Sequence, residues 1–322
     1  MPPMFLFLTL LGGLTFLALG AGALMRGTVG LAQLTRLPTF FIGLVIIAFG
    51  TSTPQLFTAI QASLSQTPVM ALATVVGASI FNIFVTLGAV GLSGGAVKLD
   101  IRLWKRGNLP LALIATGVAA ALAWFTLNGG VTPRWLGAVL LVSLALYVAF
   151  AKWMEHTQPV SLPLLKETRK LPPVIHIILF ITGLLGLILG ANLLVDVTQQ
   201  LTLKRELTAP FLGLTVLAVG TALPQLLSSM HVYREKQHTQ LLNNLVGNTI
   251  FNLLGVCGLI LAFSPIKMVW GGTILTSFFV LAGATIALLV FTHPSMRKFK
   301  RAEAILFLIA YTVFVGYVIH SM

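Results

Sequence analysis

The sequence predicts an all-α membrane protein of ten transmembrane helices, arranged as two inverted-topology repeats of five helices each. Three observations lead to this fold class. Of the 322 residues, 57% are hydrophobic and only 8% are charged, whereas a water-soluble domain has about 25% charged residues. Ten apolar runs are long enough to cross a bilayer, which takes ~20 residues each. The chain also matches itself when it is shifted by 170 residues.

The ten apolar runs are separated by short segments that hold nearly all of the charge. They cover roughly residues 4–25, 38–63, 69–93, 109–128, 134–152, 173–196, 208–230, 240–263, 271–292 and 303–321. The longest loop, at about 153–172, contains three prolines and charges of both signs. We therefore expect a first five-helix repeat at 1–152, a cytoplasmic linker at 153–172 and a second five-helix repeat at 173–322.

The net charge of +13 indicates orientation in the membrane and not a nucleic-acid partner. If both termini lie outside, sixteen of the twenty Lys and Arg residues fall in cytoplasmic loops. The positive-inside rule predicts this distribution. We expect a multi-pass protein of the cytoplasmic (inner) membrane, surrounded by lipid, with both termini outside and no nucleic-acid partner.

The internal repeat pairs polar and glycine residues that a general similarity of apolar helices does not explain. One stretch, Gly50-Thr51-x-x-Pro54-Gln55-Leu56, matches Gly220-Thr221-x-x-Pro224-Gln225-Leu226. A second stretch, Val76-Gly77-x-x-Ile80-Phe81-Asn82, matches Val246-Gly247-x-x-Ile250-Phe251-Asn252. Five helices is an odd number, so the second repeat must enter the membrane in the opposite sense. Inverted repeats are typical of secondary transporters, whose sites lie near the midplane between the halves.

The second helix of each repeat contains a proline that leaves a backbone carbonyl without its usual donor. Pro54 has no N–H for the carbonyl of Gly50, and Pro224 frees the carbonyl of Gly220 in the same way. A carbonyl left unpaired in hydrocarbon persists only where it lines a cavity or finds another partner. The pattern predicts two bent or broken helices with backbone oxygens at a central site.

Polar side chains accompany these carbonyls. Thr51 and Gln55 are four residues apart and share a helix face, with Ser52 beside them. Thr221 and Gln225 repeat the arrangement in the second half. Hydroxyl, amide and backbone oxygens of this kind bind hard cations. We therefore predict a cation site between the two helices.

The third helix of each repeat adds amides. Asn248 and Asn252 lie on one polar stripe of the second half, and Asn82 occupies the corresponding face of the first. A single amide in a membrane helix more often joins two helices than binds a ligand. A symmetric set of amides beside two proline-containing helices favours a binding site.

Two stretches and their second-half copies resemble the signature repeats of the calcium/cation antiporter superfamily, which includes the sodium/calcium exchangers. The stretches are Gly50-Thr51-Ser52-Thr53-Pro54-Gln55 and Gly77-Ala78-Ser79-Ile80-Phe81-Asn82. The resemblance covers essentially the whole chain and implies a sodium/calcium exchanger-like fold, no cofactor, and Na⁺ or Ca²⁺ as the transported ion. It places the ion-site positions at Thr51, Ser52, Gln55, Asn82, Thr221, Ala222, Gln225, Asn248 and Asn252.

The departures from the family pattern bear on which ion is carried. Both family glutamates are glutamine here, at Gln55 and Gln225, and a position that is often aspartate is Asn252. A dehydrated Ca²⁺ needs anionic ligands to offset its desolvation, and the number of charged ligands tunes its affinity. We expect a non-enzymatic antiporter that exchanges cations by alternating access, with weak Ca²⁺ selectivity.

Two alternatives remain open from the sequence. In the first, the fold transports only a monovalent cation, for which neutral oxygens suffice, or a neutral or anionic solute, which an uncharged site beside half-helix N-termini could accept. In the second, the chain is a non-transporting membrane scaffold whose amides only hold helices together.

Overall fold

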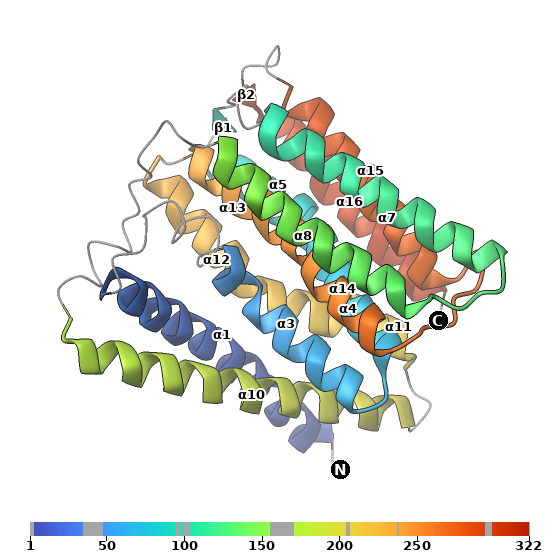
Figure 1. Cartoon of the computed structure of the whole chain (residues 1–322), viewed down its shortest axis with the longest axis horizontal. Helices are drawn as coiled ribbons and strands as arrows, with labels where there is room; N and C mark the ends of the chain where they lie inside the picture. The colour runs from blue at the N-terminus through green and yellow to red at the C-terminus, as the bar shows by residue number, and fades with distance from the viewer. Residues whose placement is uncertain are drawn as a thin grey trace.

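All ten predicted spans contain helices in the computed structural model (Figure 1). It describes residues 3–34, 48–94, 97–98, 104–154, 171–203, 207–236, 238–293 and 298–321. The first half contains α1 (Pro3–Leu34), α3 (Ala48–Leu64), α4 (Pro68–Phe81), η2 (Asn82–Thr86), α5 (Leu87–Gly94), η3 (Trp104–Asn108), α7 (Leu109–Leu127) and α8 (Arg134–Met154). The second contains α10 (Pro173–Leu203), α11 (Ala209–Leu212), η4 (Gly213–Leu217), α12 (Ala218–Arg234), α13 (His238–Ile250), η5 (Phe251–Val256), α14 (Cys257–Phe263), α15 (Thr273–Phe291) and α16 (Arg301–His320). The η segments are π-helical.

Eight of the described helices are long and apolar enough to cross a membrane. The apolar part of α8, Arg134–Phe150, is shorter. The described part of the second span, α3, has 17 residues, and the expected start of that span at 38–47 lies outside the described residues. The linker predicted at 153–172 also lies mostly outside them. The chain is a multi-pass, nearly all-helical membrane protein, as predicted.

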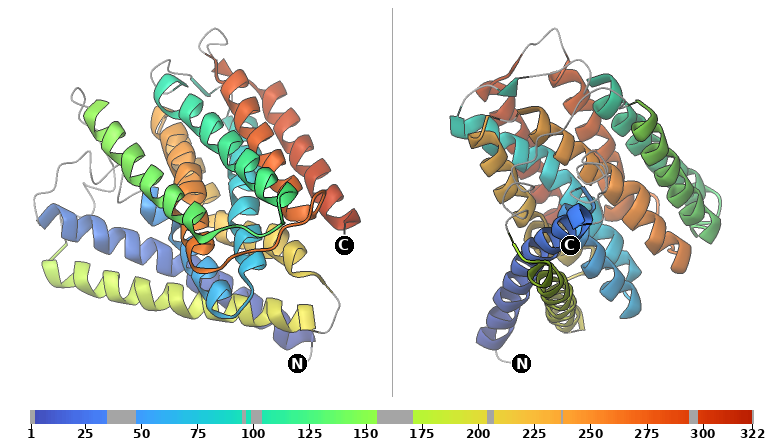
Figure 2. Two further views of the ribbon diagram at one scale, coloured as in Figure 1. Left: turned by 45° about the vertical axis from the view of Figure 1, so that its right-hand side comes forward. Right: turned by 60° about the vertical axis from the view of Figure 1, so that its left-hand side comes forward.

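Helices α1 and α10 are longer than expected and lie side by side, inclined to the other helices (Figure 2). They contain 32 and 31 residues, which at 1.5 Å per residue corresponds to about 48 Å. The hydrocarbon core is only about 30 Å thick, so helices of this length must tilt or extend beyond it. The sequence placed the end of each helix too early because it counted only the residues needed for a perpendicular span.

Glycines bring the backbones of α1 and α10 into contact. A Cβ built on Gly13 would lie 3.1 Å from the carbonyl oxygen of Gly190, and one on Gly20 would lie 2.9 Å from that of Gly183. Gly183 and Gly190 are the repeat counterparts of Gly13 and Gly20, so the two contacts are related by exchange of the halves. Close approach through small residues is the usual way in which membrane helices pack.

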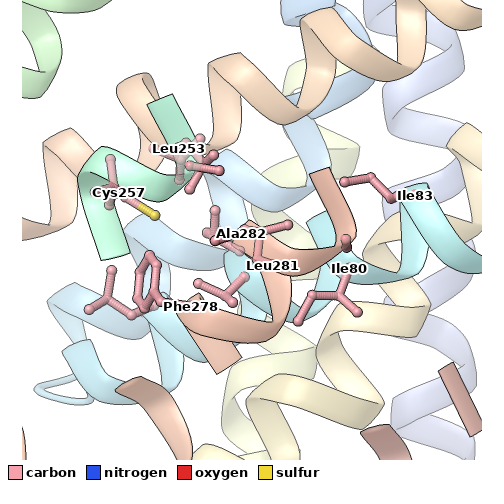
Figure 3. Close-up of a cluster of buried hydrophobic side chains, with 14 of the residues drawn as sticks. Ile80, Ile83, Leu253, Cys257, Phe278, Leu281 and Ala282 are labelled. Atoms are coloured by element: carbon pink, nitrogen blue, oxygen red, sulfur yellow. The ribbon is translucent and has the colours of Figure 1, made fainter. Parts of the chain in front are cut away.

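The rest of the interior is an apolar core formed by helices of both halves. Figure 3 shows part of it, where residues of α4, η2, η5, α14 and α15 meet: Ile80, Ile83, Leu253, Cys257, Phe278, Leu281 and Ala282. Cys257 is a free, fully buried thiol among these side chains.

A short β ribbon joins two loops at one end of the helices (Figure 1). Strands β1 (Val97–Lys98) and β2 (Lys298–Phe299) pair antiparallel, with Val97 opposite Phe299. Both of these apolar side chains are fully buried. The ribbon thus ties the loop before η3 to the start of α16.

The proline-containing helices are continuous and not broken. Helix α3 runs through Pro54 and α12 runs through Pro224. In α3 the hydroxyl of Thr53 donates to the carbonyl oxygen of Gly50 at 2.7 Å. This bond replaces the N–H that Pro54 lacks and therefore removes the reason for a break.

Substituting Gly20 by Ala is expected to destabilise the protein, whereas Gly22→Ala is not. The new Cβ at residue 20 would lie 2.8 Å from the main-chain nitrogen of Leu187, whereas a Cβ at Gly22 would meet nothing within 4 Å. Overpacking of this kind costs about 1–3 kcal/mol. Thermal unfolding of the purified variants in detergent would measure the difference. Equal midpoints for Gly20→Ala and Gly22→Ala would contradict a glycine-dependent interface.

Candidate functional site

The predicted polar residues converge where α3, α12 and the third helix of each half meet. Helix α3 carries Ser52 and Gln55, α12 carries Thr221 and Gln225, η2 begins with Asn82, and α13 and η5 carry Asn248 and Asn252. Each of these side chains is 0–1% exposed. The side chain of Thr51 lies outside the described part of the structure, although its backbone belongs to α3.

Hydrogen bonds between amides connect the two halves at this point. The Nε2 of Gln55 donates to the main-chain oxygen of Thr221 at 3.1 Å. The Nδ2 of Asn82 donates to the Oδ1 of Asn248 at 2.9 Å. That oxygen also accepts from the Nδ2 of Asn252 at 3.3 Å. Segments that are equivalent in the two repeats, and lie about 170 residues apart in the sequence, are therefore in direct contact.

The amide nitrogens and oxygens differ in their bonding. The nitrogens of Gln55, Asn82, Gln225 and Asn252 each donate to another protein group. Their oxygens have no hydrogen-bond partner among the described residues, and neither does the hydroxyl of Ser52. Five buried oxygens with available lone pairs thus come from the positions that the sequence analysis selected.

The orientation of the Gln55 amide follows from its partner. A main-chain carbonyl can only accept a hydrogen bond, so the NH₂ group of Gln55 must face Thr221. Its Oε1 then points away from that contact, and turning the amide would place two oxygens against each other. The amide atom of Gln55 that has no hydrogen-bond partner is therefore the oxygen, because only the nitrogen can donate to the carbonyl of Thr221.

The predicted backbone ligands are less alike than the repeat suggests. The carbonyl oxygen of Gly50 already accepts from Thr53, although a carbonyl oxygen has a second lone pair. The residue equivalent to Thr53 is Leu223, which has no hydroxyl to give to the carbonyl of Gly220. The hydroxyl of Thr221 donates to the carbonyl of Leu217 in its own helix at 2.8 Å.

Ala222, an ion-site position by resemblance, contributes no ligand atom. It packs with Ala78, Phe81 and Ala218 in a small apolar cluster. The cluster lies where α4 and α12 are in contact.

The structure adds residues that the sequence analysis left outside the site. Ser79 accepts from the Nδ2 of Asn252 at 3.2 Å. Thr58 and Thr86 are fully buried, and their hydroxyls have no hydrogen-bond partner among the described residues. Thr58 follows Gln55 by three residues and Thr86 follows Asn82 by four. This spacing places each threonine on the same helix face as the amide before it, and it could have identified both residues from the sequence.

Two π-helical segments start beside the amides, within one residue of equivalent positions in the two halves. Segment η2 begins at Asn82, and η5 begins at Phe251, one residue before Asn252. A π segment widens one turn of a helix and often marks a functional site. Sequence pattern did not predict these segments.

No carboxylate among the described residues is buried at this centre. Within the described residues, no three His, Cys, Asp or Glu side chains cluster so as to hold a metal ion. Asp196 lies inside α10 and is exposed, lining an open groove with Phe5 and Leu203. Among the residues that the structure describes, the centre is therefore built from neutral oxygens.

Known proteins similar to this chain include membrane exchangers and antiporters. The family described as "Sodium/calcium exchanger protein" matches residues 5–153 and 175–320. The putative antiporter CaxA of Alkalimonas amylolytica is 28% identical over 95% of each chain. The sodium/calcium exchanger MaX1 of Methanosarcina acetivorans is 23% identical over 96% of this chain and 97% of its own.

A solved structure shares the fold. The sodium-calcium exchanger NCX_Mj, soaked with Na⁺ and Sr²⁺, superposes with a TM-score of 0.68 at 24% sequence identity, over 98% of this chain and 99% of that one. Because the family match spans both halves, the chain belongs to the sodium/calcium exchanger protein family, and it is a membrane transporter of the cation-antiporter kind and not an enzyme.

Proposed function

We propose that this protein exchanges monovalent cations across the cytoplasmic membrane by alternating access, with its ion site at the amide cluster. The observation that carries the proposal is the bonding of the four amides. Their nitrogens are paired within the protein and their oxygens are left without partners. The site consists of Ser52, Gln55, Asn82, Thr221, Gln225, Asn248 and Asn252, with Thr51 and the carbonyls of Gly50 and Gly220 as further ligands.

The unpaired atoms favour a cation over an anion or a neutral solute. An anion needs free donors, and the nitrogens of Gln55, Asn82, Gln225 and Asn252 each already donate within the protein, whereas their oxygens accept nothing among the described residues. A neutral solute would need both donors and acceptors. A cation needs acceptors alone, and oxygen atoms are the ligands that hard cations prefer. A scaffold would pair these oxygens too, because a buried amide oxygen without a partner destabilises the fold.

The absence of charge favours a monovalent cation over Ca²⁺. Removing an ion from water costs more as its charge rises, and anionic ligands are what offset that cost for Ca²⁺. The two family glutamates are replaced by glutamine, their neutral isostere, at Gln55 and Gln225. The geometry of the site is thereby kept while its charge is removed.

The proposed orientation places both termini outside and the linker at 153–172 in the cytoplasm, between repeats at 1–152 and 173–322. It rests on the distribution of Lys and Arg among the loops. A similar protein of Escherichia coli, 28% identical over 80% of this chain, is described as the inner membrane protein YrbG. That location supports the cytoplasmic membrane for this chain as well.

The double variant Gln55→Glu/Gln225→Glu is expected to gain Ca²⁺ transport. Two carboxylates at the centre would offset the desolvation of Ca²⁺, and we expect uptake to rise at least about tenfold because ligand charge tunes calcium affinity. The measurement is ⁴⁵Ca²⁺ uptake into proteoliposomes that contain Na⁺ inside and none outside.

The matched control for this experiment is Gln61→Glu, which makes the same change on α3 away from the amide cluster. Gln61 contacts Ser65 near the end of the helix. Ca²⁺ uptake by the unaltered protein, equal to that of the double variant, would show that neutral oxygens suffice and would refute the monovalent preference.

Asn252→Ala is expected to weaken binding of the transported monovalent ion. The substitution removes one unpaired oxygen together with the bonds to Ser79 and Asn248. A ligand present at 100 times its Kd stabilises a protein by about 2.7 kcal/mol, so unfolding midpoints in NaCl, KCl and choline chloride report binding. We expect the unaltered protein to gain stability in Na⁺ or K⁺ and the variant to lose that gain.

The exposed residue Asn128, at the end of α7, provides the control Asn128→Ala. This variant should keep the ion-dependent shift. If neither Na⁺ nor K⁺ raises the midpoint of the unaltered protein above that in choline, the proposed monovalent site is wrong.

A further inference from the structure

Gln55 and Gln225 occupy equivalent positions of the two halves but make different hydrogen bonds. Gln55 reaches across to the main-chain oxygen of Thr221 at 3.1 Å. The symmetric bond would run from Gln225 to the main-chain oxygen of Thr51. Instead, the Nε2 of Gln225 donates within its own helix to the Oγ of Ser229 at 3.4 Å. Both glutamines are buried, with exposures of 0% and 1%.

The acceptor used by Gln225 has no counterpart in the first half. Ser229 corresponds to Ala59 in the repeat, and Ala59 is fully buried on α3. A methyl group cannot accept a hydrogen bond. A glutamine that releases its cross-repeat bond therefore finds a second partner in α12 and none at the equivalent position of α3.

This difference matters when the two halves exchange roles. In inverted repeats related by a two-fold axis in the membrane plane, exchanging the conformations of the halves turns a site from one side of the membrane to the other. After such an exchange, Gln225 would donate to Thr51 and Gln55 would turn back toward Ala59. The amide of Gln55 would then lose its bond to Thr221 and would face a methyl group where Gln225 has a hydroxyl, which is unfavourable.

A second hydrogen bond is also present in only one of two equivalent places, and it too favours the conformation seen here. The Nε2 of Gln199 on α10 donates to the main-chain oxygen of Ser65, in the connection between α3 and α4, at 2.9 Å. The counterpart of Gln199 in α1 is Val29, which has no side-chain donor. The exchanged conformation would lose this bond without gaining its mirror image.

We propose that Gln55 and Gln225 form a two-position switch, and that Ser229 is a positioning residue which, with Ala59 opposite, biases the transporter toward the conformation seen here. Ser229 holds the released amide in this conformation. Ala59 leaves the opposite conformation without that support. The inference rests on the alternating access of the proposed function but does not depend on which ion is carried.

Two single substitutions should shift the balance in the same direction by different means. Ser229→Ala removes the partner of Gln225 and destabilises the present conformation. Ala59→Ser supplies a partner for Gln55 and stabilises the opposite one. We expect each variant to raise the ratio of the second conformation to the first about tenfold, the effect of about one buried hydrogen bond, and the double variant to multiply the two shifts.

The ratio is measured as a distribution of distances between two spin labels in the full-length protein. Labels at Leu64→Cys and Leu203→Cys, both exposed, report the separation of the ends of α3 and α10, in a Cys257→Ala background. The protein is placed in lipid nanodiscs with N-methylglucamine as the only added cation, so that no transported ion biases the result.

Matched variants separate a switch from a general structural effect. Ser229→Thr keeps a hydroxyl and should restore the parent distribution. Ala62→Ser adds a hydroxyl to a buried position on α3 one turn beyond Ala59 and should change nothing. Neither variant alters a residue assigned to the ion site.

Each outcome of the measurement bears on the proposal. The switch is supported if a second spin-label distance becomes more populated in Ser229→Ala and in Ala59→Ser. The same distance should not become more populated in Ser229→Thr or Ala62→Ser. Shifts in opposite directions, or one unchanged distance in every variant, overturn the switch. Proteoliposome flux of the same variants distinguishes the two hypotheses: flux without a distance shift refutes only the switch, and a shift without flux of Na⁺, K⁺ or Ca²⁺ refutes the proposed transport.

Discussion

Because the core of a bilayer supplies no water, an amide N–H buried there must find its partner within the protein. That requirement shapes the centre of this molecule. The N–H groups of Gln55 and Asn82 find acceptors on the opposite half, at Thr221 and Asn248. The same bonds that join α3 to α12 and η2 to α13 occupy the amide nitrogens of Gln55 and Asn82 and leave their buried oxygens without a partner among the described residues. Cohesion between the halves and the chemical character of the site thus have one origin.

The helices around this centre pack in two different ways. Helices α1 and α10 meet through glycines, with backbone against backbone and a tilt that their length requires. The remaining helices interlock through large apolar side chains, as in the cluster around Phe278. Contacts that depend on close backbone approach tolerate little added volume, whereas the apolar core fixes the relative positions of the amide-bearing helices.

A duplicated fold need not have two chemically equal halves. Geometry is shared, as the paired glycine contacts of α1 and α10 show. Individual positions have diverged, with Ser52 opposite Ala222, Asn248 opposite Ala78 and Ser229 opposite Ala59. Side-chain oxygens are therefore unevenly distributed between the halves. In an inverted repeat, such differences give the two conformations, each open to one side of the membrane, different energies. The reason is that each conformation places the same residues in different surroundings.

The sequence by itself determined the ten spans, the repeat and most of the polar cluster, because span length, apolar content and a constant offset are local properties that can be read residue by residue. Tertiary structure decided the rest. It introduced π segments at Asn82 and Phe251 and selected which amide atoms remain unpaired. Those outcomes depend on neighbours such as Gln55 and Thr221, which are 166 residues apart in the chain. No local pattern specifies such a contact, because its geometry is set by how the two halves pack.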